Sequence, residues 1–303
     1  MLAAMTEEAI VVRGLRKFYG RAEAVRGIDI TVERGEVFAL LGPNGAGKTT
    51  TVEILEGHRS RTGGDVTVLG YDPAHAERAL KERIGIVLQE TGVEPYLTVA
   101  ETIKLYAGYY PRPRPVDEIL DIIGLEEQRN VLVSRLSGGQ KRRLDVGIGL
   151  AGDPDLLFLD EPTTGFDPGA RRGAWETIRN LKSLGKTIFL TTHYMEEAQL
   201  LADRAAIIVA GEIVVTGAPS ELTARDTATR ITYRGEVPPD LDVDASSAEG
   251  AVEIRTDRPV EVLHALTAWA LSSGRDLDGL RVSTASLEDV YLELTAAQEE
   301  SPT

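Results

Sequence analysis

The most constraining feature of this 303-residue sequence is an apolar segment that runs directly into a glycine-rich loop and then into a helical pattern. Residues 37–41 are Val-Phe-Ala-Leu-Leu, and residues 42–49 are Gly-Pro-Asn-Gly-Ala-Gly-Lys-Thr. Glycines let backbone N–H groups converge on phosphate oxygens, and the N-terminus of the following helix favours negative charge. The arrangement therefore predicts a phosphate-binding loop at the carboxyl end of a buried strand.

A second apolar segment ends in two carboxylates. Residues 156–159 are Leu-Leu-Phe-Leu, and Asp160 and Glu161 follow them. An acidic strand end alone is typical of a solvated loop, but parallel strands end at one edge of a sheet, where phosphates bind. We therefore expect Asp160 and Thr49 to serve Mg²⁺, Lys48 to bridge the β- and γ-phosphates of ATP, and Glu161 to polarise the attacking water.

Short apolar runs alternate with helical patterns through the first two-thirds of the chain. Runs typical of buried parallel strands occur at residues 36–41, 84–88, 155–160, 187–191 and 205–209. Shorter alternating runs, typical of an antiparallel sheet, occur at residues 10–13, 28–32 and 65–69. Ala210-Gly211 between two apolar runs indicates a hairpin. The pattern predicts an α/β fold with a parallel core sheet and an antiparallel subdomain.

Two changes of pattern predict domain boundaries. The pattern becomes helical between Pro95 and Leu150, apart from a proline-rich turn at residues 111–115, which indicates an inserted helical subdomain at about residues 90–150. After Pro219-Ser220 the strand patterns become weaker, at residues 230–233, 252–255 and 280–283. We therefore expect a main domain at residues 1–220 and a small α+β accessory domain at residues 221–303, with a regulatory or dimerisation role.

Residues 136–140, Leu-Ser-Gly-Gly-Gln, together with the loop and the carboxylates, resemble the signature of ABC-type ATPases. Further motifs follow in the family's order, namely Gln89 after an apolar run, Glu-Pro-Thr-Thr-Gly-Phe-Asp at residues 161–167, and His193 at the end of another run. The resemblance covers roughly residues 8–218. It implies the P-loop NTPase fold of an ABC nucleotide-binding domain, and hydrolysis of ATP with Mg²⁺.

The resemblance also implies roles for individual residues. Two nucleotide-binding domains of this family pair head to tail, so the signature of one subunit closes on the ATP held by the other. By resemblance, His193 would hold the γ-phosphate and the water, and Gln89 would sense Mg²⁺ and the water. The residues expected to contact ATP are Tyr19 on the adenine, Gly42, Pro43, Asn44, Gly45, Ala46, Gly47, Lys48, Thr49 and Thr50, and from the partner subunit Ser137, Gly138, Gly139 and Gln140.

The sequence departs from the family pattern at one position of the loop after Glu161. Phe166 stands before Asp167, where the family usually has leucine. This loop lies at the dimer seam in the family, so the larger side chain is expected to alter packing between subunits without removing a catalytic group. Asp167, which in the family contacts the partner subunit, is retained.

The last helical pattern in the sequence resembles one subgroup of the family. Residues 286–294, Ser-Leu-Glu-Asp-Val-Tyr-Leu-Glu-Leu, look like the ending of ATPase subunits of ABC-2 type exporters, including the daunorubicin-resistance type. In those systems a separate membrane permease carries the translocation path. An amphipathic helix that packs on its own domain explains the same pattern, and the two interpretations are compatible. The chain is thus expected to be the motor subunit of an exporter, working as a homodimer.

Net charge and hydropathy disfavour nucleic-acid binding and a membrane-spanning chain. The net charge is −15, of which −10 lies in residues 221–303, and such a surface repels nucleic acid and anionic lipid. No run approaches the roughly 18 apolar residues of a membrane helix, so we expect a cytoplasmic chain that reaches the inner face of the membrane only through the permease. There is no cysteine, which excludes disulfides and thiolate metal sites.

Two other functions compete with the exporter interpretation. A soluble ABC-type ATPase that acts on nucleic acid or ribosomes usually has two cassettes in tandem, coiled coils or zinc modules, which this sequence lacks. A regulatory subunit without hydrolytic activity is disfavoured because Lys48, Gln89, Asp160, Glu161 and His193 are all present. The motifs leave the transported substrate open.

Overall fold

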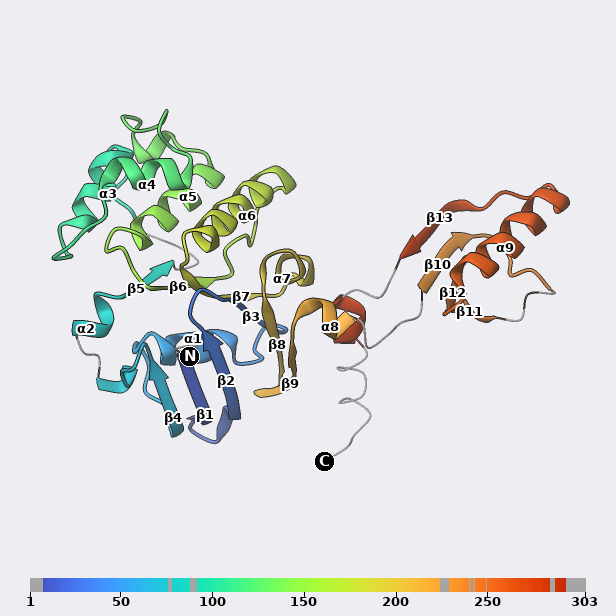
Figure 1. Ribbon diagram of the computed structural model, residues 1–303, viewed down its shortest axis with the longest axis horizontal. Helices are drawn as coiled ribbons and strands as arrows, with labels where there is room; N and C mark the ends of the chain where they lie inside the picture. The colour runs from blue at the N-terminus through green and yellow to red at the C-terminus, as the bar shows by residue number, and fades with distance from the viewer. Residues whose placement is uncertain are drawn as a thin grey trace, which may run out of the picture. The chain divides into compact units, whose positions relative to one another are not determined.

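The computed structural model divides the chain into two compact units, residues 1–218 and residues 219–303. It describes residues 8–75, 78–87, 92–223, 229–239, 241, 243–248, 250–283 and 287–292. Gln89, Ser286, Glu293 and Leu294, which the sequence analysis singled out, lie outside the described residues. The division falls two residues before the boundary expected from the sequence. The two units are considered separately below (Figure 1).

A six-stranded sheet forms the centre of the first unit, with the strand order β5-β6-β7-β3-β8-β9. Its strands are β3 (Val37–Leu41), β5 (Ile84–Val87), β6 (Leu156–Asp160), β7 (Thr187–Thr192), β8 (Arg204–Val209) and β9 (Glu212–Gly217). The first five are parallel, and β9 returns antiparallel to β8 through the expected hairpin. Every residue of β3 and β7 is buried, as expected for strands covered on both faces.

An antiparallel sheet lies beside it, with the order β2-β1-β4. Its strands are β1 (Glu8–Tyr19), β2 (Ala22–Glu33) and β4 (Gly63–Val68). Strands β1 and β2 have 12 residues each, and they are much longer than the apolar runs at residues 10–13 and 28–32 that predicted them. The register between them shifts beside Gly14 and Gly27, whose φ angles are 58° and 79°. Glycine tolerates this backbone, so the strands bend at bulges and continue.

Helices cover the central sheet and form a separate cluster. Helices α3, α4 and α5 gather at one end of the first unit, away from the antiparallel sheet (Figure 1). This cluster is the expected helical subdomain, and it lies within the expected residues 90–150. The helical elements of the unit are α1 (Lys48–Leu55), η1 (Pro73–His75), α2 (Arg78–Lys81), α3 (Val99–Ala107), α4 (Val116–Ile123), η2 (Val133–Arg135), α5 (Gly138–Gly149), α6 (Pro168–Ser183) and α7 (Met195–Leu201).

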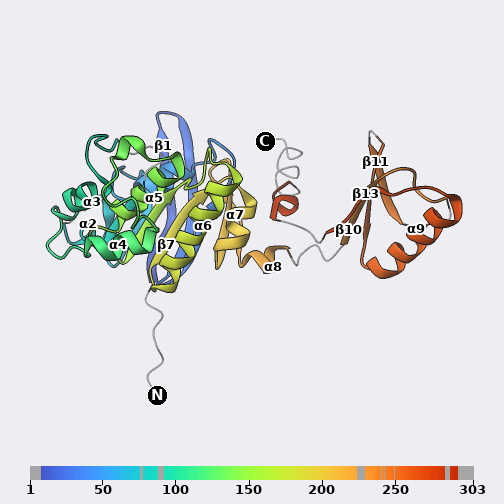
Figure 2. The same cartoon turned by 90° about the horizontal axis from the view of Figure 1, so that it is seen from above.

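The second unit is a four-stranded antiparallel sheet with a helix on one face (Figure 2). Its elements are α8 (Pro219–Thr223), β10 (Thr229–Arg234), β11 (Asp244–Ala248), β12 (Ala251–Thr256), α9 (Pro259–Ser273) and β13 (Asp278–Ser283), and residues 287–292 are helical. Strand β11 was not predicted, because Asp-Ala-Ser-Ser-Ala carries little strand propensity and is held by pairing with β12. The α/β fold class with its two subdomains and small α+β domain is confirmed.

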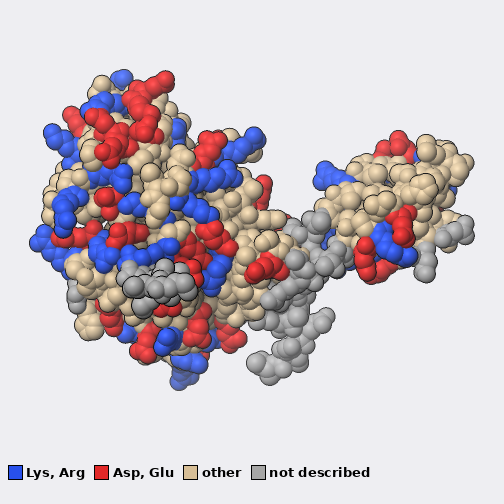
Figure 3. Space-filling model, viewed as in Figure 1, with Lys and Arg blue, Asp and Glu red and all other residues tan. Residues whose placement is uncertain are grey.

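Charged side chains are interspersed over the first unit. On the face drawn in Figure 3, Lys and Arg alternate with Asp and Glu over this unit. That face, among the described residues, shows no broad patch of one sign of the kind that steers nucleic acid to a protein. No helix within the described ranges is long and apolar enough to cross a membrane.

The core of the first unit includes a chain of three buried aromatic rings. Phe189 on β7 lies between Phe38 and Phe158, with ring centroids 5.5 Å and 5.9 Å away. All three side chains are fully buried on adjacent strands of the central sheet. Offset and tilted aromatic pairs add to the stability gained from burial alone.

Phe189→Ala is expected to lower the free energy of unfolding by about 3–5 kcal/mol, because it leaves a cavity between two rings that strands hold apart. Urea titration followed by tryptophan fluorescence measures the change. Leu184→Ala is the control, since that side chain is 49% exposed and its loss should cost little. A loss below about 1 kcal/mol for Phe189→Ala would contradict this account of the core.

Candidate active site

The glycine-rich loop connects β3 to α1 at the carboxyl edge of the central sheet. A Cβ atom at Gly42 would lie 2.2 Å from the carbonyl oxygen of Ile208 on β8. A Cβ atom at Gly47 would lie 2.6 Å from the carbonyl oxygen of Ala24, and Gly47 has a φ of 105°. Only glycine fits at these two positions, so the loop's backbone is fixed by its packing against β8 and β2. Its N–H groups precede the first turn of α1, where an anion binds favourably.

Lys48 is the first residue of α1 and is buried, with 5% of its surface exposed. Its ammonium donates to the carbonyl oxygens of Gly42 (2.8 Å) and Pro43 (3.1 Å). Burial lowers the pKa of Lys48, and the carboxylates of Glu161 and Asp160 oppose that shift. A buried ammonium is costly unless anionic groups lie close to it. Two carbonyl oxygens and a carboxylate at 3.7 Å offset only part of the charge of Lys48, so the loop presents a cation to an anionic ligand.

Glu161 follows β6 in a left-handed backbone conformation, with a φ of 45°. Its N–H donates to both the carbonyl (3.2 Å) and the hydroxyl oxygen (3.1 Å) of Thr191 on the neighbouring strand. Its carboxylate accepts a hydrogen bond from the hydroxyl of Thr164 at 3.0 Å. Non-glycine residues with such φ values are uncommon and concentrate at functional sites. The strain therefore marks Glu161 as a residue whose position is held by its surroundings.

The two carboxylate oxygens of Glu161 face two different side chains. Oε1 lies 3.7 Å from Nζ of Lys48, and Oε2 lies 3.3 Å from Nδ1 of His193. His193 follows β7 directly, and its side chain is 32% exposed. Asp160 lies beside Glu161 and accepts a hydrogen bond from the hydroxyl of Thr191. The structure thus brings together Lys48, Asp160, Glu161 and His193, which come from three separate parts of the sequence.

Two residues that the sequence analysis did not single out hold this arrangement. Thr191 contacts both acidic residues, donating its hydroxyl to Asp160 and accepting from the Glu161 N–H. Arg142 on α5 is buried and donates to the carbonyl oxygens of Asp160 (3.1 Å) and Pro162 (3.1 Å). A threonine that directly follows the apolar run Ile188–Leu190 was the available signal for the first. Arg142 gave no sequence signal, because the atoms through which it contacts Asp160 and Pro162 are backbone carbonyl oxygens.

Tyr19 ends β1 and is 42% exposed. Its hydroxyl lies 3.4 Å from the Thr50 hydroxyl on α1, so the tyrosine belongs to the same region as the glycine-rich loop. Lys17 Nζ and the Arg59 guanidinium lie 5.2 Å and 5.3 Å from the centroid of its ring. Cations at this distance are attracted to the face of an aromatic ring and also favour a nearby phosphate.

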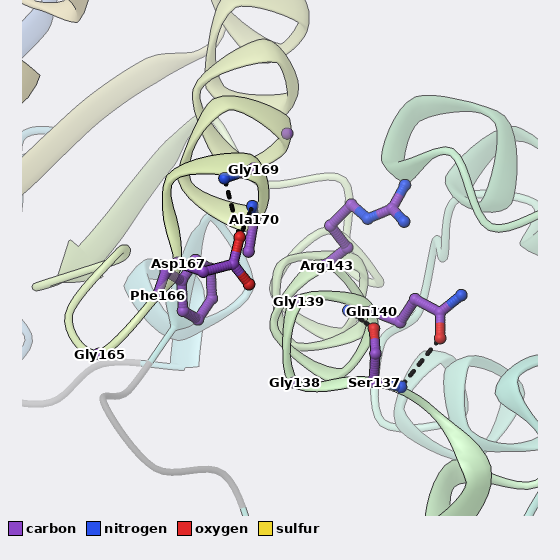
Figure 4. A pocket seen from close by; sticks show the side chains of 11 residues that line it. Ser137, Gly138, Gly139, Gln140, Arg143, Gly165, Phe166, Asp167, Gly169 and Ala170 are labelled. Carbon is purple, nitrogen blue, oxygen red and sulfur yellow. Dashed lines mark hydrogen bonds between the residues drawn. The ribbon is translucent and has the colours of Figure 1, made fainter.

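The signature segment lines a separate pocket of about 450 Å³ between the starts of α5 and α6 (Figure 4). Ser137 caps α5, accepting from the Gln140 N–H (3.2 Å) while its own N–H donates to the Gln140 side chain (2.9 Å). At the helix start Gly138 is exposed and Gly139 is half-buried. None of the residues 42–49 lines this pocket, so the loop and the signature face different openings of one chain.

The opposite wall of this pocket is the loop after Glu161. Asp167 caps α6 by accepting from the N–H groups of Gly169 (2.8 Å) and Ala170 (2.9 Å). These backbone hydrogen bonds lower the pKa of Asp167. Phe166 also lines the pocket, opposite the signature (Figure 4). The residue that departs from the family pattern therefore shapes the opening onto which the signature faces.

Glu56 is a further acidic residue near the site that sequence reasoning missed. It is the C-cap of α1 and is only 4% exposed. Burial raises its pKa to about 8, and the nearby carboxylates of Asp160 and Glu53 add to the shift. Nδ1 of His58 lies 3.3 Å from its Oε2. The Glu56 carboxyl is therefore protonated near neutral pH, which removes a negative charge that would repel the Asp160 carboxylate.

Comparison with known proteins identifies the family. Residues 25–164 match the ABC transporter family, and residues 232–286 match the family described as "ABC transporter domain-containing protein-like, C-terminal domain". The Nod factor export ATP-binding protein I of Ralstonia nicotianae is 38% identical over 302 residues, covering 95% of this chain and 94% of that protein. The chain belongs to the ABC transporter ATP-binding proteins.

Other relatives of this ABC ATPase agree with that assignment. The linearmycin resistance ATP-binding protein LnrL of Bacillus subtilis is 35% identical and covers 93% of this chain and 96% of its own length. Among solved structures, cbiO1 of Clostridium perfringens is 30% identical with a TM-score of 0.63, covering 72% of this chain and 91% of its own. The family resemblance and the ATPase activity expected from the motifs are confirmed.

Glu56→Gln is expected to flatten the pH dependence of stability of the ABC ATPase. Because the folded-state pKa of Glu56 exceeds its ordinary value of 4.5, the folded protein binds more protons than the unfolded chain between about pH 4.5 and 8. The free energy of unfolding therefore falls as the pH rises through this window. Each unit of pKa is worth about 1.4 kcal/mol, so the variant should gain several kcal/mol relative to wild type between pH 5 and pH 8.

Urea titrations at pH 5 and pH 8 measure this difference. Glu176→Gln is the control, because Glu176 is exposed on α6, and it should reproduce the wild-type dependence on pH. If the free energy of unfolding changed equally between pH 5 and pH 8 in wild type and in Glu56→Gln, the Glu56 carboxyl would be ionised in the folded protein, which would contradict the assignment.

Proposed function

We propose that this chain is the ATP-hydrolysing motor subunit of an exporter whose translocation path lies in a separate membrane permease. Its relatives in Ralstonia nicotianae and Bacillus subtilis are named for Nod factor export and linearmycin resistance. The alignments span more than nine-tenths of those relatives and include the second unit as well as the ATPase unit. The likeness along the whole length supports a shared role in export.

The observation that carries hydrolysis is the convergence of Lys48, Glu161 and His193 at the end of the central sheet. Glu161 lies between the ammonium (3.7 Å) and the imidazole (3.3 Å), each facing a different carboxylate oxygen. Bound ATP would place its γ-phosphate against Lys48, with the phosphate oxygens taking the place of the carbonyl partners of the ammonium. The carboxylate of Glu161 would then lie beside the space in front of the γ-phosphorus.

In this proposal the residues divide the work of hydrolysis. Glu161 accepts a hydrogen bond from the attacking water and receives its proton as the new P–O bond forms and ADP leaves. His193 holds the γ-phosphate and the water, and Lys48 offsets the charge of the β- and γ-phosphates. Tyr19 stacks on the adenine, and residues 42–50 surround the phosphates with backbone N–H groups.

A magnesium ion fits the donor set at this edge. Thr49 is exposed on the first turn of α1 and offers a hydroxyl, and Asp160 offers a carboxylate at the end of β6. Oxygen donors of this kind, completed by phosphate oxygens, are those that Mg²⁺ prefers. We assign Thr49 and Asp160, together with Gln89, to the ion. When bound, Mg²⁺ would supply charge neutralisation at the phosphates.

The separation of the signature pocket from the glycine-rich loop supports a head-to-tail homodimer. Ser137, Gly138, Gly139 and Gln140 lie at an exposed helix start on the wall of another pocket. In a second copy the same helix start would meet the γ-phosphate that the loop of the first copy holds. ATP then lies between the two subunits. Asp167 and Phe166 line the same opening and would contact the partner copy.

We further propose that dimer closure is passed to the permease through the helical cluster α3–α5, and that the second unit is an accessory domain for regulation or dimerisation. Arg142 supports the first step, since it joins α5 to the backbone at Asp160 and Pro162. In this arrangement the ATPase works on the cytoplasmic face of the membrane and is held there by the permease.

Glu161→Gln should abolish turnover and preserve ATP binding, because the amide keeps the shape of the side chain but accepts no proton. We expect kcat to fall by at least about 10²-fold, the usual contribution of a general base. Phosphate release measures turnover, and a fluorescent ATP analogue measures binding, with Glu176→Gln as the exposed control. Full ATPase activity in Glu161→Gln would refute the assignment of the base.

ATP should convert the Glu161→Gln protein from monomer to dimer, since the nucleotide then joins two subunits and is not hydrolysed. Size-exclusion chromatography with light scattering, with MgATP and without nucleotide, measures the change. Adding Ser137→Arg should prevent the dimer while leaving ATP binding at the loop intact, because the bulk and charge lie in the signature pocket. A monomer in saturating MgATP would contradict the head-to-tail arrangement.

A further inference from the structure

The ring of His193 is packed against an aromatic side chain that the proposed function does not use. The imidazole lies against the ring of Tyr194, with centroids 4.1 Å apart and ring planes at 40°. Nδ1 of His193 makes no hydrogen bond to any described residue, although it lies 3.3 Å from Glu161 Oε2. A histidine is usually oriented by a hydrogen bond at one ring nitrogen. Contact with the Tyr194 ring therefore contributes to the orientation of the imidazole.

Tyr194 also contacts a residue of α6. The guanidinium carbon of Arg171 lies 4.3 Å from the centroid of the Tyr194 ring, well within the distance of a cation–π contact. The Nε atom of Arg171 is buried and has no hydrogen-bond partner among the described residues. This guanidinium is therefore held against the ring by packing and charge, without a fixed hydrogen bond at Nε.

A second contact holds α6 against the start of α7. Trp175, one turn after Arg171 on α6, donates its indole N–H to Glu197 at 3.1 Å, three residues after Tyr194. Glu197 is fully buried, and burial raises its pKa while Arg171 acts against the shift. Residues one turn apart on a helix share a face, so Arg171 and Trp175 together present one face of α6 to the start of α7. Figure 2 shows the two helices side by side.

The start of α6 is itself fixed to the loop that follows Glu161. Asp167 caps the helix, and the N–H of Arg171 donates to the carbonyl oxygen of Asp167 at 3.0 Å. Arg171 therefore lies in the first turn of α6, directly after Asp167, which lines the signature pocket. The packed series Arg171, Tyr194 and His193 runs from that wall to the carboxylate of Glu161.

We propose that Arg171 and Tyr194 are positioning residues for His193, and that their stack connects the loop at the subunit seam to the hydrolytic centre of the same chain. The inference rests on the proposed function, because it concerns the efficiency of that site. A shift of the loop on dimer closure would move the first turn of α6 and, through Tyr194, the imidazole. Such a connection acts on the chemical step and leaves ATP binding at the glycine-rich loop unchanged.

The test compares Tyr194→Leu and Arg171→Gln with wild type in steady-state ATP hydrolysis by the full chain. Each variant should lower kcat on the order of tenfold, since small displacements of a catalytic group cost that much or more, and leave KM within about twofold. Tyr194→Phe and Arg171→Lys keep the ring and the charge and should restore most of kcat. Arg172→Gln, exposed on the same helical turn, should match wild type.

A double-mutant comparison separates positioning from a general loss of structure. If Tyr194 acts through His193, Tyr194→Leu should cause no further loss in a His193→Ala protein, measured by single-turnover hydrolysis with enzyme in excess. An equal loss in both backgrounds would overturn the proposal, as would wild-type kcat in both Tyr194→Leu and Arg171→Gln. If Tyr194→Leu does not fold, as judged by thermal unfolding, Arg171→Gln decides by the same comparison. Absence of hydrolysis by wild type would instead overturn the proposed function.

Discussion

The buried ammonium of Lys48 is the constraint around which the site is built. A cation with 5% exposure is costly unless anionic or carbonyl groups surround it. The carbonyl oxygens of Gly42 and Pro43 and the carboxylate of Glu161 do so here. Both groups of partners depend on the central sheet, since β3 ends in the loop and β6 ends in Glu161. The sheet therefore fixes the distance between the glycine-rich loop and the carboxylate of Glu161.

Two neighbouring residues, Thr191 on β7 and Arg142 on α5, stabilise the same edge of the sheet. Thr191 holds the backbone of Glu161 and the carboxylate of Asp160, and Arg142 holds the carbonyl oxygens that flank them. Glu161 keeps a left-handed φ of 45° only because these contacts outweigh the local strain. The buried Glu56 carries a proton, so the region avoids a further negative charge next to Asp160.

Sequence patterns located the central strands well and their neighbours less well. Strands β3, β6 and β7 are almost wholly buried, so each contains an apolar run of three to five residues with clear ends. Strand β1 extends to Tyr19 because a bulge at Gly14 lets it bend, and β11 exists because β12 offers it a pairing edge. Neither a bulge nor a pairing edge leaves an apolar pattern in the segment concerned.

The sequence alone determined the family, the loop at residues 42–49 and the identities of Lys48, Asp160, Glu161 and His193, because these depend on residue type and order along the chain. Tertiary structure decided how they act together. Glu161 faces both Lys48 and His193, and Arg171 packs against Tyr194 beside the imidazole. These contacts join segments that are far apart in sequence. Such contacts depend on distances across strands and helices, which no local pattern of residues encodes.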